Sequence, residues 1–238
     1  MDDQDAFLAT RCPTANRPLI GLTVLVVEDS RFSCEAMRLL CLRSGARIRR
    51  ADCLRSARRH LQVYRPSAVI VDLGLPDGSG VELIDELNNS SPRVDVVLGT
   101  SGDDNAMGLA MAAGADGFLA KPVTNLAVFQ ESVLAHLPKD RQPSGPRPMN
   151  NHEIIPDQIA YRDDMALIAD MLNENTDDRL LDYVAQFVTG VARSASDAAL
   201  QQAGTDLAAA RRDNAPSGAI LARVAGMVQD RLSDRVMI

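Results

Sequence analysis

Asp72 is the first residue whose surroundings suggest chemistry, because it directly follows a short apolar run, AVIV at 68–71. A β-branched run of this length without polar alternation is typical of a strand covered on both faces, as in a parallel sheet. Ligands of open parallel sheets bind outside the carboxyl ends of the strands. Asp72 is therefore placed for metal binding or catalysis, although an isolated Asp at such a position is more often a turn or helix-capping residue.

Other apolar runs also end in polar side chains, and this strengthens the case for Asp72. The runs and the polar residues that follow them are 22–27 with Glu28 and Asp29, 94–98 with Thr100, and 118–120 with Lys121. A parallel sheet places the carboxyl ends of its strands at one edge. The pattern therefore predicts that these side chains meet in one cleft.

The expected cleft would combine three carboxylates with a hydroxyl and an ammonium. Carboxylates held close together repel one another, and a hard divalent cation relieves this repulsion. Mg²⁺ suits such a site, since it prefers oxygen ligands and commonly takes one or two carboxylates together with phosphate oxygens. The backbone carbonyl of Gly74 lies close enough in sequence to contribute, Lys121 offers a charge for an anion, and Thr100 offers a hydrogen-bond donor. These groups predict phosphoryl transfer with Asp72 as the nucleophile.

Helical patterns separate the candidate strands. A weaker strand is expected at 46–50, and apolar residues at helical spacing indicate helices near 32–40, 53–63, 81–87, 106–113 and 126–137. Five strand–helix alternations in about 120 residues predict an α/β doubly wound parallel sheet with helices on both faces.

Four sequence motifs together carry a family resemblance. They are VLVVEDS at 24–30, VIVDLGLPDGSG at 69–80, Thr100, and FLAKP at 118–122. In this order the motifs resemble the receiver domain of bacterial two-component response regulators, over roughly residues 22–137. The resemblance implies a flavodoxin-like sheet of strand order 2-1-3-4-5. It also implies that Asp72 accepts a phosphoryl group from a sensor histidine kinase or a phosphotransfer protein.

The resemblance assigns roles to the residues around Asp72. Asp29 would bind Mg²⁺ directly, Glu28 would bind it through water, and the backbone carbonyl of Gly74 would complete the protein ligands. Lys121 would pair with the phosphoryl group, and the peptide bond between Lys121 and Pro122 would be cis.

Two switch positions are also implied. Thr100 would move toward the phosphoryl oxygens and Phe118 would rotate inward behind it, although simple core packing also explains Phe118. The spacing from Thr100 to Lys121 is 21 positions, about one shorter than the family pattern. Ser101 is therefore an alternative switch hydroxyl, while Gly99 occupies the position that the usual spacing would give to the hydroxyl.

Composition limits the class of protein. The chain has 238 residues, 46% of them hydrophobic, and no apolar run approaches the ~18 residues that a membrane span needs. The acidic first residues do not resemble a signal peptide, and the four Cys show no CxxC pairing. A net charge of −7 argues against a general affinity for nucleic acid or anionic membranes. We expect a cytoplasmic protein with reduced cysteines.

The domain organisation follows from the Pro-rich sequence PKDRQPSGPRPM after the receiver-like region. We predict an N-terminal arm at 1–20, a receiver domain at 21–137, a linker at 138–150 and a helical domain at 151–238. Amphipathic patterns in this last part predict a small helical bundle with segments at 159–172, 180–191, 200–210 and 220–228.

The helical half is similar to the opening helices of histidine phosphotransfer domains at 166–191 and 204–215. That family carries a phosphorylatable His shortly after the position of Arg211 and Arg212, where this chain reads NAPSG at 214–218. An unrelated helical bundle explains the pattern equally well. Without that His, the half would serve for docking to a protein target or for homodimerisation.

The sequence therefore predicts a two-component response regulator that signals by protein contacts and catalyses only its own phosphorylation and dephosphorylation. From residue 150 onward there are eight Arg, no Lys and fourteen Asp or Glu, and this charge balance argues against DNA binding by the helical half. A phosphate sink or a phosphorelay intermediate remains an alternative. A hydrolase of external phosphate esters is less favoured, since no second acid or base is evident near Asp72.

Overall fold

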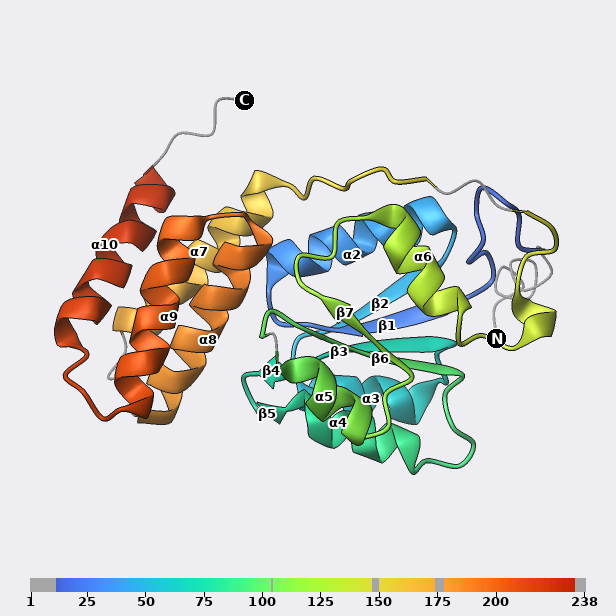
Figure 1. Cartoon of the computed structure of the whole chain (residues 1–238), viewed down its shortest axis with the longest axis horizontal. Coiled ribbons are helices and arrows are strands. Elements are labelled where there is room, and N and C mark those ends of the chain that lie inside the picture. The colour runs from blue at the N-terminus through green and yellow to red at the C-terminus, as the bar shows by residue number, and fades with distance from the viewer. Residues whose placement is uncertain (1–11, 104, 147–149, 174–177, 234–238) are drawn as a thin grey trace. The chain divides into compact units, whose positions relative to one another are not determined.

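The computed structural model describes residues 12–103, 105–146, 150–173 and 178–233 of the chain. Contacts within the chain define two compact units, both drawn in Figure 1. The first unit comprises the chain up to Asp29 together with Ala36–Ile155. The second comprises Ser30–Glu35 and Pro156–Ile238.

The first unit is built on a five-stranded parallel sheet (Figure 1). Its strands are β1 (Thr23–Val27), β2 (Arg47–Ala51), β3 (Ala68–Asp72), β6 (Val96–Ser101) and β7 (Gly117–Ala120). The strand order is β2-β1-β3-β6-β7, which confirms the predicted doubly wound sheet. A short antiparallel hairpin of β4 (Gly74–Leu75) and β5 (Gly78–Ser79) follows Asp72 and was not predicted.

Helices cover both faces of this sheet (Figure 1). On one face lie α2 (Arg31–Ser44) and α6 (Leu126–Leu134), and on the other lie α3 (Leu54–Val63), α4 (Gly80–Asn88) and α5 (Ala106–Ala112). Successive residues of β1 alternate between the two hydrophobic clusters: Val24 and Val26 belong to one, Leu25 and Val27 to the other. This double burial explains why the strands read as continuous apolar runs.

The predicted linker begins with a short 3-10 helix, η1 (Lys139–Arg141), that is fixed to the first unit. The Arg141 guanidinium donates to the Asp95 carboxylate at 2.5 Å and to the Ser67 hydroxyl at 3.0 Å. The linker is therefore bound to the sheet edge where β3 and β6 begin, before it leaves the domain.

A second contact fixes the end of the linker region. The backbone N–H of Leu126 donates to the carbonyl of His152 at 3.1 Å, and that of Ile154 donates to the carbonyl of Thr124 at 2.9 Å. Ile154 is only 2% exposed and belongs to the same hydrophobic cluster as Leu126. The first unit therefore extends to Ile155, beyond the predicted start of the second domain at residue 151, because one buried side chain holds this segment.

We predict that Ile154→Ala destabilises the first unit by about 2–4 kcal/mol, because it removes a buried side chain and leaves a cavity. The neighbouring Ile155 is 83% exposed, so Ile155→Ala should change the free energy of unfolding by no more than about 0.5 kcal/mol. Urea denaturation of the full chain measures both variants. Equal effects would show that residue 154 does not belong to the core.

The second unit is helical, as predicted. It contains α7 (Gln158–Asn173), α8 (Asp178–Ser194), α9 (Ala198–Arg212) and α10 (Gly218–Ser233). One hydrophobic cluster, which includes Met165, Val188 and Val224, joins these helices. The segment at 213–217, which contains Pro216, separates α9 from α10, as expected for a residue that breaks helices.

Asp197 connects three parts of this helical unit. Its carboxylate caps α9 by accepting from the backbone N–H of Leu200 at 3.1 Å, and it also accepts from the Tyr161 hydroxyl at 2.8 Å. Arg231 of α10 binds the same carboxylate through two nitrogens. These bonds, with those from Arg231 first, lower the pKa of Asp197 to about 2. The carboxylate therefore ties α7, α9 and α10 together.

Candidate functional site

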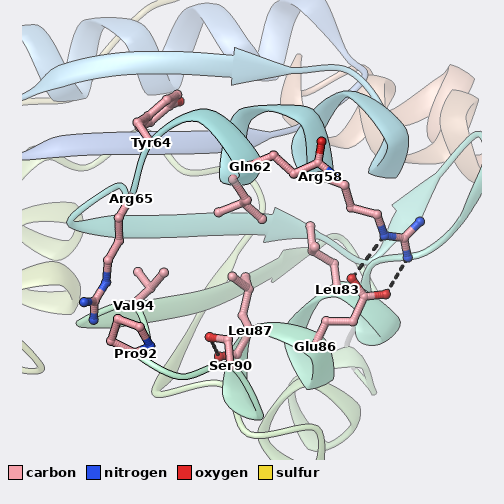
Figure 2. A pocket seen from close by; sticks show the side chains of 11 residues that line it. Arg58, Gln62, Tyr64, Arg65, Leu83, Glu86, Leu87, Ser90, Pro92 and Val94 are labelled. Carbon is pink, nitrogen blue, oxygen red and sulfur yellow. Dashed lines mark hydrogen bonds and ion pairs between the residues drawn. The ribbon is translucent and has the colours of Figure 1, made fainter. Parts of the chain in front are cut away.

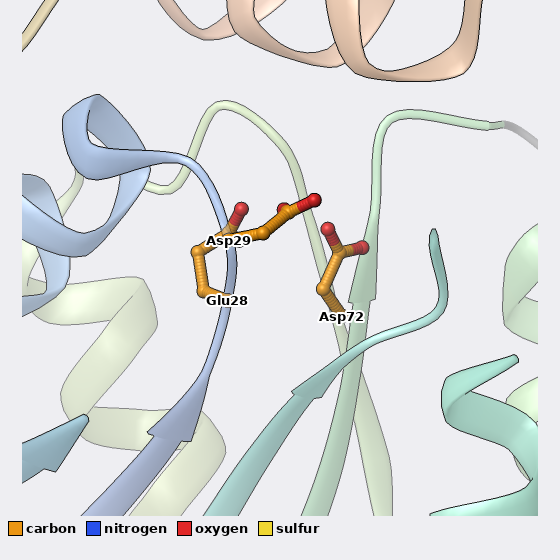
Figure 3. A group of neighbouring side chains, drawn as sticks. All are labelled: Glu28, Asp29 and Asp72. Carbon is orange, nitrogen blue, oxygen red and sulfur yellow. The ribbon is translucent and has the colours of Figure 1, made fainter. Parts of the chain in front are cut away.

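Three carboxylates converge at the carboxyl ends of two adjacent strands (Figure 3). Glu28 and Asp29 follow β1, and Asp72 is the last residue of β3. The parallel register pairs Val27 with Val71, so Glu28 and Asp72 occupy matching positions one residue further along. One oxygen from each of the three carboxylates lies within 4.8 Å of the others. The sheet has brought together the three acidic residues that the sequence predicted to meet.

Lys121 lies between two of these carboxylates. Its Nζ is 2.8 Å from Oδ2 of Asp72 and 2.7 Å from Oε2 of Glu28, and all three side chains are buried. Burial alone would lower the pKa of Lys121, but the negative charges of Asp72 and Glu28 outweigh burial and raise it. Lys121 is therefore held as an ammonium at neutral pH.

The charge balance of the site favours a further cation. Burial raises the pKa of Glu28 well above its ordinary value; the Lys121 ammonium opposes this increase, and the carboxylates of Asp72 and Asp29 add to it. Three carboxyl groups beside one ammonium concentrate negative charge in a largely buried place, and a divalent cation would relieve their repulsion. The donor set consists of carboxylate oxygens, which fits the preference of Mg²⁺ for hard oxygen ligands.

The family model of the response regulator receiver domain matches residues 24–132. These residues form a receiver domain. The match covers the five strands of the sheet, except Thr23 at the start of β1, and the acidic site at their ends. It confirms the resemblance stated from the sequence motifs, and it leaves the helical unit without a family assignment.

Curated relatives match the same part of the chain. The KDP operon transcriptional regulatory protein KdpE of Escherichia coli (strain K12) is 29% identical over 139 residues, which cover 58% of this chain and 61% of KdpE. The virulence transcriptional regulatory protein PhoP of Salmonella typhimurium (strain 14028s / SGSC 2262) is 32% identical over 103 residues, 42% of this chain and 46% of PhoP. The chain therefore spans less than two thirds of the length of either relative.

Among solved structures, the chain is similar to the signal receiver domain of a signal transduction histidine kinase from Syntrophus aciditrophicus. The two are 25% identical, with a TM-score of 0.46, over 52% of this chain and 97% of that one.

Two hydroxyl side chains lie at the end of β6 in the receiver domain. The register pairs Thr100 directly with Asp72, and paired residues of parallel strands point to the same face of a sheet. Thr100 is fully buried, and its hydroxyl donates to the Leu119 carbonyl at 2.8 Å. Ser101 follows on the opposite face and accepts from the backbone N–H of Asp103 at 3.1 Å. This placement favours Thr100 over Ser101 as the hydroxyl near Asp72.

Three further predicted site residues are Phe118, Pro122 and Gly74. Phe118 is partly buried and pairs in register with Gly99, where a Cβ atom at position 99 would lie 3.2 Å from its ring. The peptide bond between Lys121 and Pro122 is cis. The backbone N–H of Gly74 donates to Oδ1 of Asp72 at 3.3 Å, so the residue expected to offer its carbonyl to the metal lies beside the carboxylate.

Two features of the site were not foreseen from the sequence. The first is the ion pair between Lys121 and Glu28, which gives Glu28 a partner besides the expected metal. The second is Gly80, whose backbone approaches that of Asp72 so closely that a Cβ atom would lie 2.0 Å from the Asp72 carbonyl oxygen. Gly80, the second glycine of the sequence DGSG, was the only indication in the sequence, and a glycine alone does not reveal which backbone it approaches.

A separate groove of about 560 Å³ lies between α3 and α4 (Figure 2). Its apolar lining includes Leu61, Leu83 and Leu87, and at one end Arg58 forms an ion pair with Glu86 at 2.6 Å. None of the residues that line the groove belongs to the acidic site. Among the described residues, no helix is long and apolar enough to cross a membrane.

Gly80→Ala should destabilise the receiver domain by about 1–3 kcal/mol, because the new methyl group would push against the backbone of Asp72. Gly108 is a matched control in a helix, since a Cβ atom there would have no neighbour within 4 Å. Gly108→Ala should be neutral or stabilising by up to about 1 kcal/mol. Thermal unfolding followed by circular dichroism compares the two, and a neutral Gly80→Ala would contradict the close approach.

Proposed function

We propose that this protein is a response regulator that accepts a phosphoryl group on Asp72 from a sensor histidine kinase or a phosphotransfer protein. One observation carries the proposal: a buried ammonium, Lys121, contacts the Asp72 carboxylate beside two further carboxylates at the same sheet edge. The receiver-domain match of residues 24–132 supports it. We place the protein in the cytoplasm, where such kinases present their phosphorylated His.

In the proposed reaction a carboxylate oxygen of Asp72 attacks phosphorus. A P–O bond to Asp72 forms while the P–N bond to the donor His breaks, and the bond electrons return to the imidazole. Mg²⁺ held by Asp29, Asp72, the Gly74 carbonyl and, through water, Glu28 would neutralise charge on the phosphoryl oxygens.

Lys121 would exchange its bond with Asp72 for one with a phosphoryl oxygen. Thr100 would then break its bond to the Leu119 carbonyl and donate to another phosphoryl oxygen, and Phe118 would turn into the space behind it. This local change of charge and hydrogen bonding would alter the surface formed by α5, β7 and α6. Catalysis is thus confined to the protein's own Asp72, and no external substrate is converted.

We further propose that the output is contact with another protein, made by the helical unit. The sequence of that unit from Pro156 onward contains no His, so it cannot receive the phosphoryl group on a His of its own. His152 lies in the first unit and contacts Arg43 at 2.9 Å. A phosphate sink or relay intermediate is the alternative, with transfer to a separate protein.

Asp72→Asn should abolish labelling by radioactive acetyl phosphate in the presence of Mg²⁺, because the amide lacks the nucleophilic carboxylate. The label is measured on the full chain after gel electrophoresis. Asp140→Asn, at an exposed position of η1, is the matched control and should label like the wild type. Persistent labelling of Asp72→Asn would place the acceptor elsewhere.

A transcriptional role is a second candidate, because KdpE and PhoP are named as transcriptional regulatory proteins. Direct DNA binding needs basic side chains that neutralise phosphates. From residue 150 onward the chain has eight Arg against fourteen Asp or Glu, and several of these Arg are engaged by acids, as Arg211 is by Asp178 and Asp182.

The full chain should therefore leave the fluorescence anisotropy of a labelled DNA duplex unchanged at 50 mM salt, both untreated and with Mg²⁺ and beryllofluoride. Binding that weakens steeply as salt rises would instead support a DNA-binding regulator and contradict an output limited to protein contacts.

A further inference from the structure

The hairpin that follows Asp72 is attached to the start of a distant helix. The Asp77 carboxylate, at the tip of the β4–β5 hairpin, accepts from the backbone N–H of Leu54 at 2.8 Å and from that of Arg55 at 3.0 Å. These two N–H groups belong to the first turn of α3. Next to Asp77 the backbone of Gly78 also approaches Leu54, since a Cβ atom there would lie 2.8 Å from the Leu54 side chain.

Asp77 caps the N-terminus of α3 in place of Cys53, the residue that precedes the helix. Cys53 is the N-cap residue and has extended backbone, but its side chain makes no capping hydrogen bond. The first N–H groups of a helix have no partner within the helix, and a carboxylate there gains from the helix dipole. Burial alone would raise the pKa of Asp77, but the two backbone hydrogen bonds outweigh it and lower the pKa. The attachment therefore holds an ionised carboxylate.

The other end of the hairpin lies at the acidic site. Gly74, in β4, donates its N–H to Oδ1 of Asp72 at 3.3 Å, and β4 pairs with β5 through Gly74 and Ser79. A backbone bond from Gly80 to Leu73 at 3.1 Å closes the base of the hairpin. The hairpin is thus fixed at its base beside Asp72 and at its tip by α3. Without the attachment of the tip, the hairpin and Gly74 within it would be held only at the base.

We propose that Asp77 is a positioning residue for the metal site: by binding the N-terminus of α3 it holds the β4–β5 hairpin so that the backbone of Gly74 is fixed beside Asp72. This inference rests on the proposed function, in which the Gly74 carbonyl is a Mg²⁺ ligand. Asp77 itself does not touch the metal or the phosphoryl group.

The test is calorimetric titration of the full chain with MgCl₂. Asp77→Ala should weaken Mg²⁺ binding about tenfold, the lower end of the effect usual for residues that orient a ligand. Asp77→Asn keeps one acceptor oxygen for α3 and should weaken binding less than Asp77→Ala. Cys53→Ser alone, which changes neither the hairpin nor the acidic site, should bind Mg²⁺ like the wild type.

A double variant separates positioning from simple helix capping. Cys53→Ser combined with Asp77→Ala gives α3 a local cap, because Ser is a favoured N-cap residue, but it does not reattach the hairpin. Thermal unfolding should show recovered stability, whereas Mg²⁺ affinity should stay about tenfold weak.

The possible failures are distinguishable. Recovery of Mg²⁺ affinity together with stability in the double variant would show that Asp77 only caps α3, and would overturn this inference alone. Unchanged Mg²⁺ affinity in both Asp77 variants would do the same. Failure of the wild-type chain to bind Mg²⁺ would overturn the inference together with the metal-dependent function on which it rests.

Discussion

The buried ammonium of Lys121 between the carboxylates of Asp72 and Glu28 is the interaction on which the site depends. Neither partner is stable alone in this place, because an unpaired buried charge is costly. Lys121 sustains a concentration of negative charge that would otherwise hold protons or disperse. Under the proposed function, a phosphoryl group on Asp72 would compete directly for this ammonium.

The architecture of the sheet makes this pairing possible. Helices cover both faces of the sheet, and its parallel strands present all their carboxyl ends at one edge, where ligands bind. Residues separated by 93 positions in the sequence, Glu28 and Lys121, consequently meet. The loop after Asp72 is constrained from two sides, by the close approach of Gly80 to the backbone of Asp72 and by the bonds from Asp77 to α3. Backbone packing at Gly80 and hydrogen bonding by Asp77 thus both restrain the loop beside Asp72.

The end of the predicted linker region, up to Ile155, belongs to the first unit. Ile154 is buried in the core, and its backbone N–H donates to the carbonyl of Thr124, which lies three residues after Lys121. The end of the first unit is therefore hydrogen-bonded to the segment that follows Lys121, although Ile154 and Lys121 are 33 positions apart in the sequence.

The sequence by itself determined the helical second half and the convergence of Glu28, Asp29, Asp72 and Lys121, because hydrophobic periodicity and strand ends are local signals. The strand order followed from the resemblance of the sequence motifs to receiver domains. The sequence could not locate the domain boundary at Ile155, the β4–β5 hairpin, or the roles of Gly80 and Asp77. Those depend on contacts between residues far apart in the chain, such as Asp77 with Leu54. Only the tertiary structure could decide these features. The type of a residue shows which groups it can bind, whereas the packing of the chain determines which groups lie close to it.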